Sequence, residues 1–158
     1  YEAEMAFVIG KAGKRISRER ALEHLAGYTI LNDVSAREWQ RRTSQWILGK
    51  TSDTFCPLGP CLAMSDEVPT RGAMGLKLSI GGELLQQSNT AQMVFGVEDI
   101  VEYLSAVFTL EPGDVVATGT PGGVGSVRKP PRWLRPGDVV RIELQGVGVL
   151  ENPVKASR

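Results

Sequence analysis

The sequence predicts an α+β fold: a single domain over residues 1–158, built on mixed or antiparallel β-sheets with a few short helices. Three observations lead to this class. Short runs rich in β-branched residues outnumber the segments with helical periodicity. Strands and helices do not alternate in the rhythm of a doubly wound parallel sheet. The length and the 42% of hydrophobic residues suffice for one core and are short for two.

Apolar periodicity and terminating residues place the elements of the first half of the chain. Ser17 is a plausible N-cap for a short amphipathic helix, and Gly27 is a plausible stop at its C-terminus. The expected order is a strand at about 2–10, this helix at 17–27, a buried strand at 27–34, a helical turn or two at 35–42 and an irregular stretch at 43–60.

Turn residues organise the second half. The run LKLSIGGELL (76–85) predicts two strands joined by a Gly-Gly hairpin turn, and VEDIVEYLSAVF (97–108) has the apolar spacing of the longest helix. The sequence Pro-Gly-Asp occurs in LEPGDVVAT and again in LRPGDVVRI, which indicates two strands entered through the same type II turn. The final segment, 139–154, is expected to form a hairpin around Gln145 and Gly146.

Charge and composition limit the classes of partner that are expected. Eighteen basic residues balance eighteen acidic ones and form no stripe, so no nucleic acid is expected and a small molecule is the favoured partner. No apolar run approaches the length of a membrane span and no leader pattern is present, which predicts no membrane and a cytoplasmic location. Cys56 and Cys61 lack the spacing of a redox or zinc site and are expected to be buried thiols.

Two carboxylates stand one residue apart at the head of the first strand. Residues i and i+2 of a strand point to the same face, roughly 6–7 Å apart, so Glu2 and Glu4 share one side while the larger apolar residues take the other. Like charges this close repel each other. A solvent-exposed edge tolerates such repulsion, and a divalent cation bound by both groups explains it as well.

Further candidates follow along the chain. Asp33 is the natural third oxygen ligand, or else the N-cap of the next helical turn, where Arg37 can pair with it. Lys50 lies in the irregular stretch, where functional residues concentrate, although a lysine in a loop is usually only solvated. The glycine-dense ATGTPGGVGS lacks a phosphate-loop ending; it is either a tight connection or a turn whose backbone N–H groups bind an anion such as a substrate carboxylate. His24, the only histidine, is expected to be an ordinary surface or half-buried residue.

Together these segments resemble the catalytic C-terminal domain of the fumarylacetoacetate hydrolase family. The likeness covers nearly the whole chain through YEAEMAFVIGK, AGYTILNDVSAREWQ, GKTSDTFCPLGP, GELLQQSNTAQMVF, LEPGDVVATGTPGGVG and PGDVVRIELQGVGVLENPV. It implies mixed β-sheets rolled around an active site, a homodimer, and Mg²⁺ or Mn²⁺ acting on a 2-oxo acid. The residues it implies are the metal ligands Glu2, Glu4 and Asp33, the substrate-side pair Arg37 and Gln40, the active-site Lys50, and Gly119 and Thr120 in the turn that contacts the substrate carboxylate.

The first reaction that the resemblance implies is hydrolysis of a C–C bond in a β-diketo acid of the acylpyruvate or fumarylpyruvate type, as in aromatic catabolism. In hydrolytic members a histidine and a glutamate on an upstream lid activate water; this segment is expected to be missing here, and His24 does not align with it. Ser52 also replaces a more usual aromatic residue beside Lys50. The alternatives are decarboxylation or enol–keto isomerisation of a 2-oxo dicarboxylic acid, of the oxaloacetate or 2-hydroxyhepta-2,4-dienedioate type, and a non-catalytic 2-oxo acid binder. The basic stretch VRKPPRWLRPGD is either a dimer contact or an exposed loop.

Overall fold

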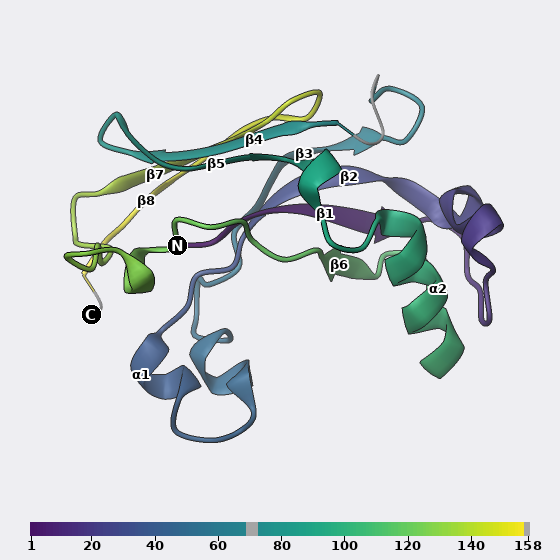
Figure 1. The fold of residues 1–158 in the computed structure, drawn as a ribbon, viewed down its shortest axis with the longest axis horizontal. Coiled ribbons are helices and arrows are strands. Elements are labelled where there is room, and N and C mark those ends of the chain that lie inside the picture. The colour runs from purple at the N-terminus through teal and green to yellow at the C-terminus, as the bar shows by residue number, and fades with distance from the viewer. Residues whose placement is uncertain (69–72, 157–158) are drawn as a thin grey trace.

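Two four-stranded antiparallel sheets pack face to face in the computed structural model, which describes residues 1–68 and 73–156 (Figure 1). The first sheet has the order β3-β2-β1-β6, with β1 at Ala3–Ile9, β2 at Leu25–Asn32, β3 at Leu58–Met64 and β6 at Val115–Ala117. The second has the order β5-β4-β7-β8, with β4 at Gly75–Ile80, β5 at Glu83–Asn89, β7 at Val139–Leu144 and β8 at Gly148–Pro153. The predicted α+β class is confirmed, and the pairings between these strands are antiparallel.

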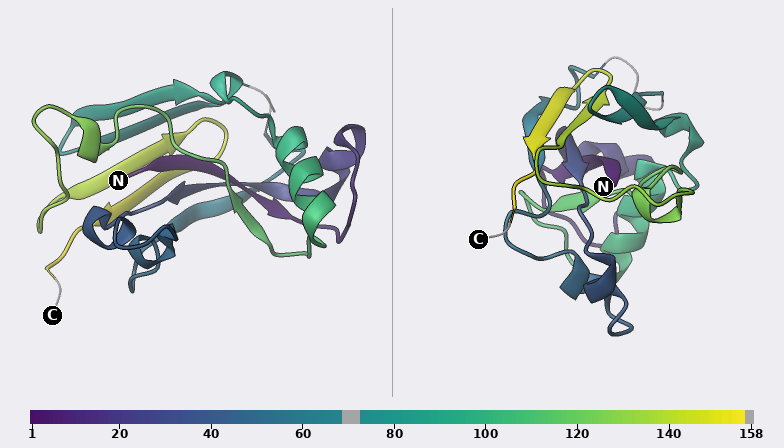
Figure 2. Two further views of the ribbon diagram at one scale, coloured as in Figure 1. Left: turned by 60° about the horizontal axis from the view of Figure 1, so that its bottom comes forward. Right: turned by 90° about the vertical axis from the view of Figure 1, so that its left-hand side faces the viewer.

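Short helices flank the sheets. The α-helices are α1 (Arg37–Gln40) and α2 (Val97–Val107), and the 3-10 helices are η1 (Arg18–His24), η2 (Trp46–Gly49), η3 (Thr90–Gln92) and η4 (Gly125–Val127). Within the described ranges α2 is the longest of them, as its periodicity predicts. Figure 2 shows α2 and η1 at the same end of the molecule, where they pack together. None of the helices in the described part of the chain combines the length and the apolar character needed to cross a bilayer.

The hydrophobic core lies between the two sheets. Met5, Phe7 and Ile9 of β1 belong to it, as the alternation in the first strand predicts, and none is more than 3% exposed. Leu78 of β4 and Ile142 of β7 contribute from the opposite sheet. The alternate residues of β1, which include Glu4, are therefore directed to the outer face of the first sheet.

The predicted helix at 17–27 is wrong in type and in its end. The helical segment is the 3-10 helix η1, and the chain enters β2 at Leu25. Gly27 is not a helix stop: it lies within β2, where a Cβ atom would come within 2.1 Å of the carbonyl oxygen of Ala63 in β3. The glycine therefore permits the close approach of two strands.

The stretch at 43–60, expected to be irregular, contains η2 and the beginning of β3. Strand β3 lies at the edge of its sheet and pairs with β2 through an irregular register, and its Leu58 and Met64 are exposed. Alternating burial, the usual sign of a strand, is consequently weak here. The expectation of buried thiols is also wrong, because Cys56 precedes this edge strand, Cys61 lies in it, and both are exposed.

The turn predictions are confirmed. Gly81 and Gly82 join β4 to β5 with φ angles of +59° and +85°, as a hairpin turn of this kind requires. The glycines of the two Pro-Gly-Asp turns, Gly113 and Gly137, both have φ of +95°. In each turn the aspartate N–H donates to the carbonyl oxygen three residues earlier, at 3.0 Å and 2.9 Å. The closing hairpin, β7 and β8, forms around Gln145 and Gly146.

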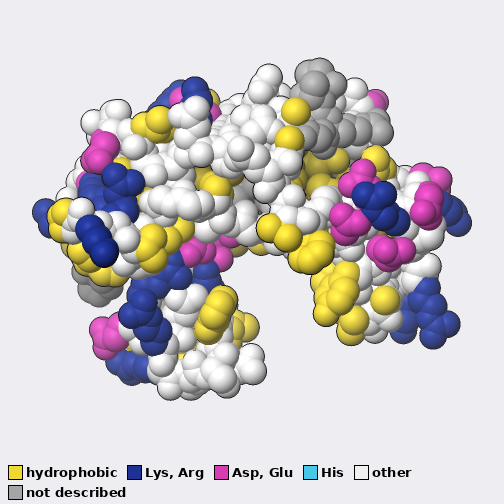
Figure 3. All heavy atoms as spheres, viewed as in Figure 1, with side chains coloured by type: hydrophobic (Ala, Val, Ile, Leu, Met, Phe, Trp, Pro, Cys, Tyr) yellow, Lys and Arg dark blue, Asp and Glu magenta, His cyan; other side chains and the backbone are white. Residues whose placement is uncertain are grey.

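One part of the chain stands away from the sheets. We call residues 35–56, which contain α1 and η2, the α1 lobe; it projects from the first sheet on the same side as α2 (Figure 1). The space-filling view shows the surface hollowed between the α1 lobe and α2, with acidic and basic side chains where the lobe meets the sheets (Figure 3). The outer face of the first sheet thus opens into a concave surface.

Candidate metal and substrate site

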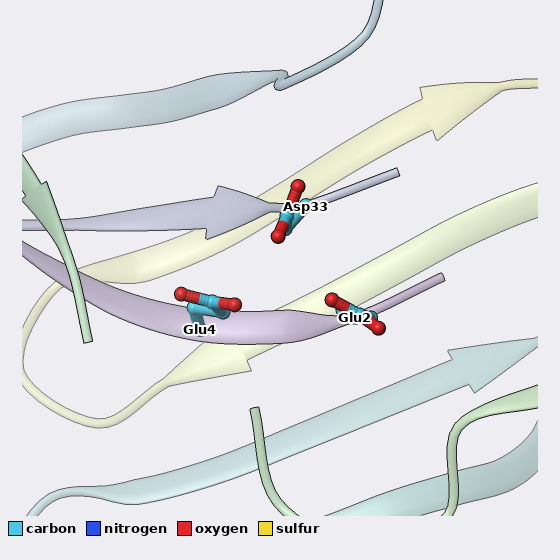
Figure 4. Close-up of side chains that lie close together, drawn as sticks. All are labelled: Glu2, Glu4 and Asp33. Atoms are coloured by element: carbon cyan, nitrogen blue, oxygen red, sulfur yellow. The ribbon is translucent and has the colours of Figure 1, made fainter. Parts of the chain in front are cut away.

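Three carboxylates meet at one end of the first sheet. Ligand atoms of Glu2, Glu4 and Asp33 all lie within 4.8 Å of one another, and Figure 4 shows the three groups as a triangle. The register of β1 with β2 pairs Ala3 with Asn32, so the chain leaves β2 beside Glu2, and the Asp33 N–H donates to the Glu2 carbonyl oxygen at 2.9 Å. Strand pairing therefore unites groups about thirty positions apart in sequence.

Glu2 and Glu4 are not on a solvent-exposed edge, so that interpretation of the paired carboxylates is wrong. Glu2 is 8% exposed and Glu4 is 3% exposed. Burying like charges side by side is costly unless cations compensate them. The N-cap interpretation of Asp33 is wrong as well, because Ala36 occupies the N-cap of α1.

Two cationic side chains reach the cluster from the α1 lobe. The Lys50 ammonium donates to Glu2 Oε2 at 2.9 Å and forms a second ion pair with Asp33. The Arg37 guanidinium forms an ion pair with Glu2, not with Asp33, and donates to the Gln40 side-chain oxygen at 2.8 Å. Gln40 is 6% exposed, so a buried side chain within the lobe holds Arg37.

The pKa values of Glu2 and Glu4 are shifted in opposite directions. Burial, opposed by a hydrogen bond from the Gly119 N–H and strengthened by the charges of Asp33 and Glu2, raises the pKa of Glu4 to about 7. Burial acts in the same direction on Glu2, but hydrogen bonds from Lys50 and Arg37 outweigh it and hold the pKa of Glu2 below its ordinary value. Glu2 is thus fully ionised at neutral pH, while Glu4 titrates near it.

Lys50 is held as an ammonium. Burial lowers the pKa of its amine, but the hydrogen bonds to Asp33 and Glu2 outweigh burial and leave the pKa above its ordinary value. The side chain therefore carries a proton that it can donate within the site.

The glycine-rich turn borders the cluster. The Gly119 N–H donates to Glu4 Oε2 at 2.8 Å, and φ at Gly119 is +91°, a conformation that glycine adopts without strain. The Thr120 hydroxyl donates to the Ala3 carbonyl oxygen at 2.8 Å. Both groups are thus bonded to the carboxylate strand itself, and their predicted contact with a substrate carboxylate stays a prediction.

The donor set fits a hard divalent cation. Mg²⁺ and Mn²⁺ prefer carboxylate oxygens, and three converging carboxylates leave coordination positions for other oxygen ligands. Two of the three groups are buried, which distinguishes the cluster from acidic patches on a solvated surface. The roles of Glu2, Glu4 and Asp33 as metal ligands stay predictions with this geometric support.

Sequence reasoning missed two polar residues beside the site. The Asn32 side-chain oxygen accepts from the Glu2 N–H at 3.2 Å, and the Gln86 carboxamide bonds to Ala3 and Thr120. Gln86 comes from the second sheet, and no local pattern distinguishes it from its exposed neighbour Gln87. His24, expected at the surface or half-buried, is 6% exposed. It directly precedes β2, whereas Asp33 directly follows this strand, about 30 Å away along an extended chain.

Comparison with known proteins identifies the family of the chain. The sequence profile of the fumarylacetoacetate hydrolase C-terminal family matches residues 1–155. A protein of Xenopus laevis named as a mitochondrial oxaloacetate tautomerase is 53% identical over 156 residues, which are 98% of this chain and 49% of that protein. The chain therefore spans about half the length of the curated relatives that it matches.

Solved structures share the whole fold. A fumarylacetoacetate hydrolase of Exiguobacterium antarcticum has a TM-score of 0.96 and 43% identity, covering 99% of this chain and 56% of that one. A probable 2-hydroxyhepta-2,4-diene-1,7-dioate isomerase of Mycobacterium abscessus has a TM-score of 0.92 and 41% identity, with 99% and 60% covered. A maleylpyruvate hydrolase of Sphingobium sp. SYK-6, in complex with manganese(II) and pyruvate, has a TM-score of 0.87 and 34% identity, with 99% and 54% covered.

Proposed function

The chain belongs to the fumarylacetoacetate hydrolase family, and we propose that it catalyses the divalent-metal-dependent enol–keto tautomerisation of a 2-oxo dicarboxylic acid of the oxaloacetate type. The observation that carries this proposal is the Lys50 ammonium bonded to two members of the Glu2, Glu4 and Asp33 cluster. A cation site and a proton donor therefore share one location.

The charges of the site suit an anionic substrate. The three carboxylates, the two cations Lys50 and Arg37 and one divalent ion together leave a single net positive formal charge. Mg²⁺ or Mn²⁺, held by Glu2, Glu4 and Asp33, would supply Lewis acidity that stabilises negative charge on the substrate oxygens. Arg37, which pairs with Glu2 at the edge of the cluster, would add positive charge that attracts a substrate carboxylate.

Lys50 is the group that we assign to proton transfer. In the ketonising direction the enol O–H proton leaves to solvent, and the resulting enolate carbon takes a proton from the Lys50 ammonium. Water then reprotonates the neutral amine. A raised pKa keeps Lys50 protonated before the step, and its contacts with Glu2 and Asp33 hold the ammonium at the cluster.

Tautomerisation needs fewer groups than the hydrolysis that the sequence first implies. Hydrolysis requires in addition a base that activates water, a role for which we assign no residue of this chain. The similarity to a protein named as an oxaloacetate tautomerase, at 53% identity, further supports tautomerisation. The name of this relative also places that protein in mitochondria; the cytoplasmic location expected for this chain stays a prediction.

Hydrolysis of a β-diketo acid is the second candidate. The specific observation in its favour is the TM-score of 0.87 with a maleylpyruvate hydrolase that binds manganese(II) and pyruvate. Two further candidates are decarboxylation of oxaloacetate and binding of a 2-oxo acid without turnover. One experiment can distinguish these four functions.

The test uses the full-length protein with Mn²⁺ or Mg²⁺, assayed against enol-oxaloacetate, maleylpyruvate and an acylpyruvate, with products identified by mass spectrometry. Accelerated conversion of enol- to keto-oxaloacetate without loss of mass, abolished by EDTA and by Glu4→Gln, is the expected result. Cleavage of the diketo acids would favour the hydrolase. Release of CO₂ from oxaloacetate would favour a decarboxylase, and binding of oxalate without any turnover would favour a binder.

A further inference from the structure

We propose that Gln86 is a positioning residue of the metal and substrate site, a role that rests on the proposed function. Its side chain links the strand segment that carries Glu2 and Glu4 to the turn that carries Gly119. Its hydrogen bonds in the described part of the chain go to Ala3, Thr120 and Pro121, and not to the three carboxylates or Lys50. It acts through the backbone of Ala3 and through Thr120.

The need for such a link begins where β6 ends. Strand β6 pairs with β1 only at Ala6, Phe7 and Val8, so the ladder stops before the carboxylate end of β1. Beyond it the chain turns outward, which brings the Gly119 N–H within 2.8 Å of Glu4 Oε2. The backbone groups of β1 that a longer β6 would have paired require other partners.

Side chains supplement the ladder beyond Ala6. The Met5 carbonyl oxygen accepts from the Thr118 N–H at 3.3 Å and from the Thr118 hydroxyl at 2.7 Å, and the Thr120 hydroxyl donates to the Ala3 carbonyl oxygen at 2.8 Å. The Ala3 N–H donates to Gln86 Oε1 at 3.0 Å. Ala3, which stands between the two glutamates, thus has both of its backbone polar groups fixed by side chains from distant elements.

The second half of the carboxamide holds the turn. Gln86 Nε2 donates to Thr120 Oγ1 at 2.8 Å and to the Pro121 carbonyl oxygen at 2.9 Å. Gln86 is 2% exposed, so water does not substitute readily for these partners. One buried amide is therefore bonded both to the strand segment between Glu2 and Glu4 and to the turn that follows Gly119, and it reinforces the direct bonds between them.

Packing keeps the turn against β5. A Cβ atom at Gly123 would lie 2.4 Å from the Leu85 carbonyl oxygen and 3.3 Å from Gln86 Cγ, and φ at Gly123 is +103°. The turn consequently rests directly on the strand that carries Gln86. A side chain of the same size without hydrogen-bonding groups would leave the Ala3 N–H and the Pro121 carbonyl oxygen without these partners and would loosen Glu4 from Gly119.

Residues that orient metal ligands typically contribute about 10- to 100-fold to metal affinity or activity. We therefore expect Gln86→Met to weaken Mn²⁺ binding by about tenfold or more. Gln87→Met is the matched control, because Gln87 is the next residue of β5 and its side chain is exposed. The affinities are measured on the full-length protein by titration calorimetry with Mn²⁺ alone, so that no substrate has to be known.

Amide hydrogen exchange on the metal-free protein supplies the second measurement. In Gln86→Met the Ala3 and Gly119 amides are expected to exchange faster, while amides of the β4–β7 ladder keep their wild-type rates. Loss of fold alone would accelerate both sets together. Wild-type exchange and wild-type Mn²⁺ affinity in Gln86→Met would overturn the proposal.

A second pair of variants covers the case in which Gln86→Met does not fold. Thr120→Val removes the hydroxyl between Gln86 and Ala3, and Thr120→Ser restores it. Weakened Mn²⁺ binding in the valine variant with recovery in the serine variant supports the link; equal affinities overturn it. A wild-type protein that binds no Mn²⁺ would instead refute the proposed function, and the exchange rates of Ala3 and Gly119 would then decide the role of Gln86.

Discussion

The ionised form of Glu4 is unfavourable within the metal-free site. Its carboxyl is buried beside Glu2 and Asp33, and its pKa of about 7 compares with an ordinary value of 4.5. The folded state therefore binds the Glu4 proton more tightly than the unfolded state. This contribution to stability is fully present below pH 4.5 and is lost as the pH rises through about 7.

The first prediction is that metal-free Glu4→Gln gains stability relative to wild type as the pH rises. The shift corresponds to about 3 kcal/mol in the free energy of unfolding between pH 4.5 and about pH 8. Urea unfolding at several pH values in this window measures it. The lowered pKa of Glu2 acts below pH 4.5 and does not confuse the result.

The same substitution should abolish Mn²⁺ binding, because a neutral amide replaces an anionic ligand. Stabilisation of the wild-type protein by Mn²⁺ at about pH 8, absent in Glu4→Gln, is the accompanying control. A wild-type protein whose stability does not decline relative to Glu4→Gln over this window would contradict the assigned environment of Glu4.

Lys50 permits a separation of metal binding from proton transfer. Lys50→Met is expected to reduce turnover by about 100-fold or more, the usual contribution of a positioned acid or base. Mn²⁺ affinity should be kept or increased, because the ammonium no longer competes for Glu2 and Asp33. Steady-state kinetics together with Mn²⁺ titration distinguish this from a general loss of the site, in which both quantities would fall.

At the scale of elements, the α1 lobe delivers Arg37 and Lys50 to carboxylates that belong to the sheet. Its two helices pack against each other at Gly49, where a Cβ atom would come within 2.5 Å of Gln40 Cβ and 2.8 Å of Gln40 Cα. The residue after Gly49 is Lys50, so the spacing of α1 and η2 determines where the ammonium lies.

We accordingly predict that Gly49→Ala reduces turnover by about tenfold while the midpoint of thermal unfolding changes little, because α1 and η2 pack mainly on each other. Gly122→Ala is a suitable control, since no atom lies within 4 Å of the position of its Cβ. Kinetics and thermal unfolding of both variants provide the measurement. Wild-type turnover in Gly49→Ala would show that the lobe absorbs the added methyl group without moving Lys50.

At the scale of the whole molecule, apolar side chains are gathered on and next to α2. Val94, Phe95, Tyr103 and Val107 are between 66% and 90% exposed. Contiguous apolar surface of this kind is uncommon on a monomer. The homodimer that the sequence implies would cover it.

We predict a solution mass of twice 17.1 kDa for this chain, and a shift toward the monomer in Val107→Asp. Val127→Asp is the matched comparison, because both valines are 68% exposed and Val127 begins the basic stretch that the sequence leaves as a dimer contact or a loop. Analytical ultracentrifugation of both variants distinguishes the two candidate interfaces. If only Val127→Asp dissociated the dimer, the interface would lie at the basic stretch and not at α2.

The sequence by itself determined the features that short-range chemistry controls. Alternation placed Glu2 and Glu4 opposite the core residues of β1, glycine and proline fixed the hairpin and the type II turns, and periodicity placed α2. The family and the candidate residues from Glu2 to Thr120 could also be predicted from the sequence, because the motifs of the family occur in it in order.

Only the tertiary structure decided the contacts between segments far apart in the chain. Pairing of β1 with β2 placed Asp33 beside Glu2, the fold of the α1 lobe brought Lys50 and Arg37 to Glu2, and the turn after β6 brought Gly119 to Glu4. The tertiary structure also placed Gly27 within a strand and left Cys56 and Cys61 exposed. It buried Gln86, whereas the neighbouring Gln87 is exposed. The physical reason is that burial and hydrogen-bond partners here depend on the register of non-local strands, which periodicity along one segment does not encode.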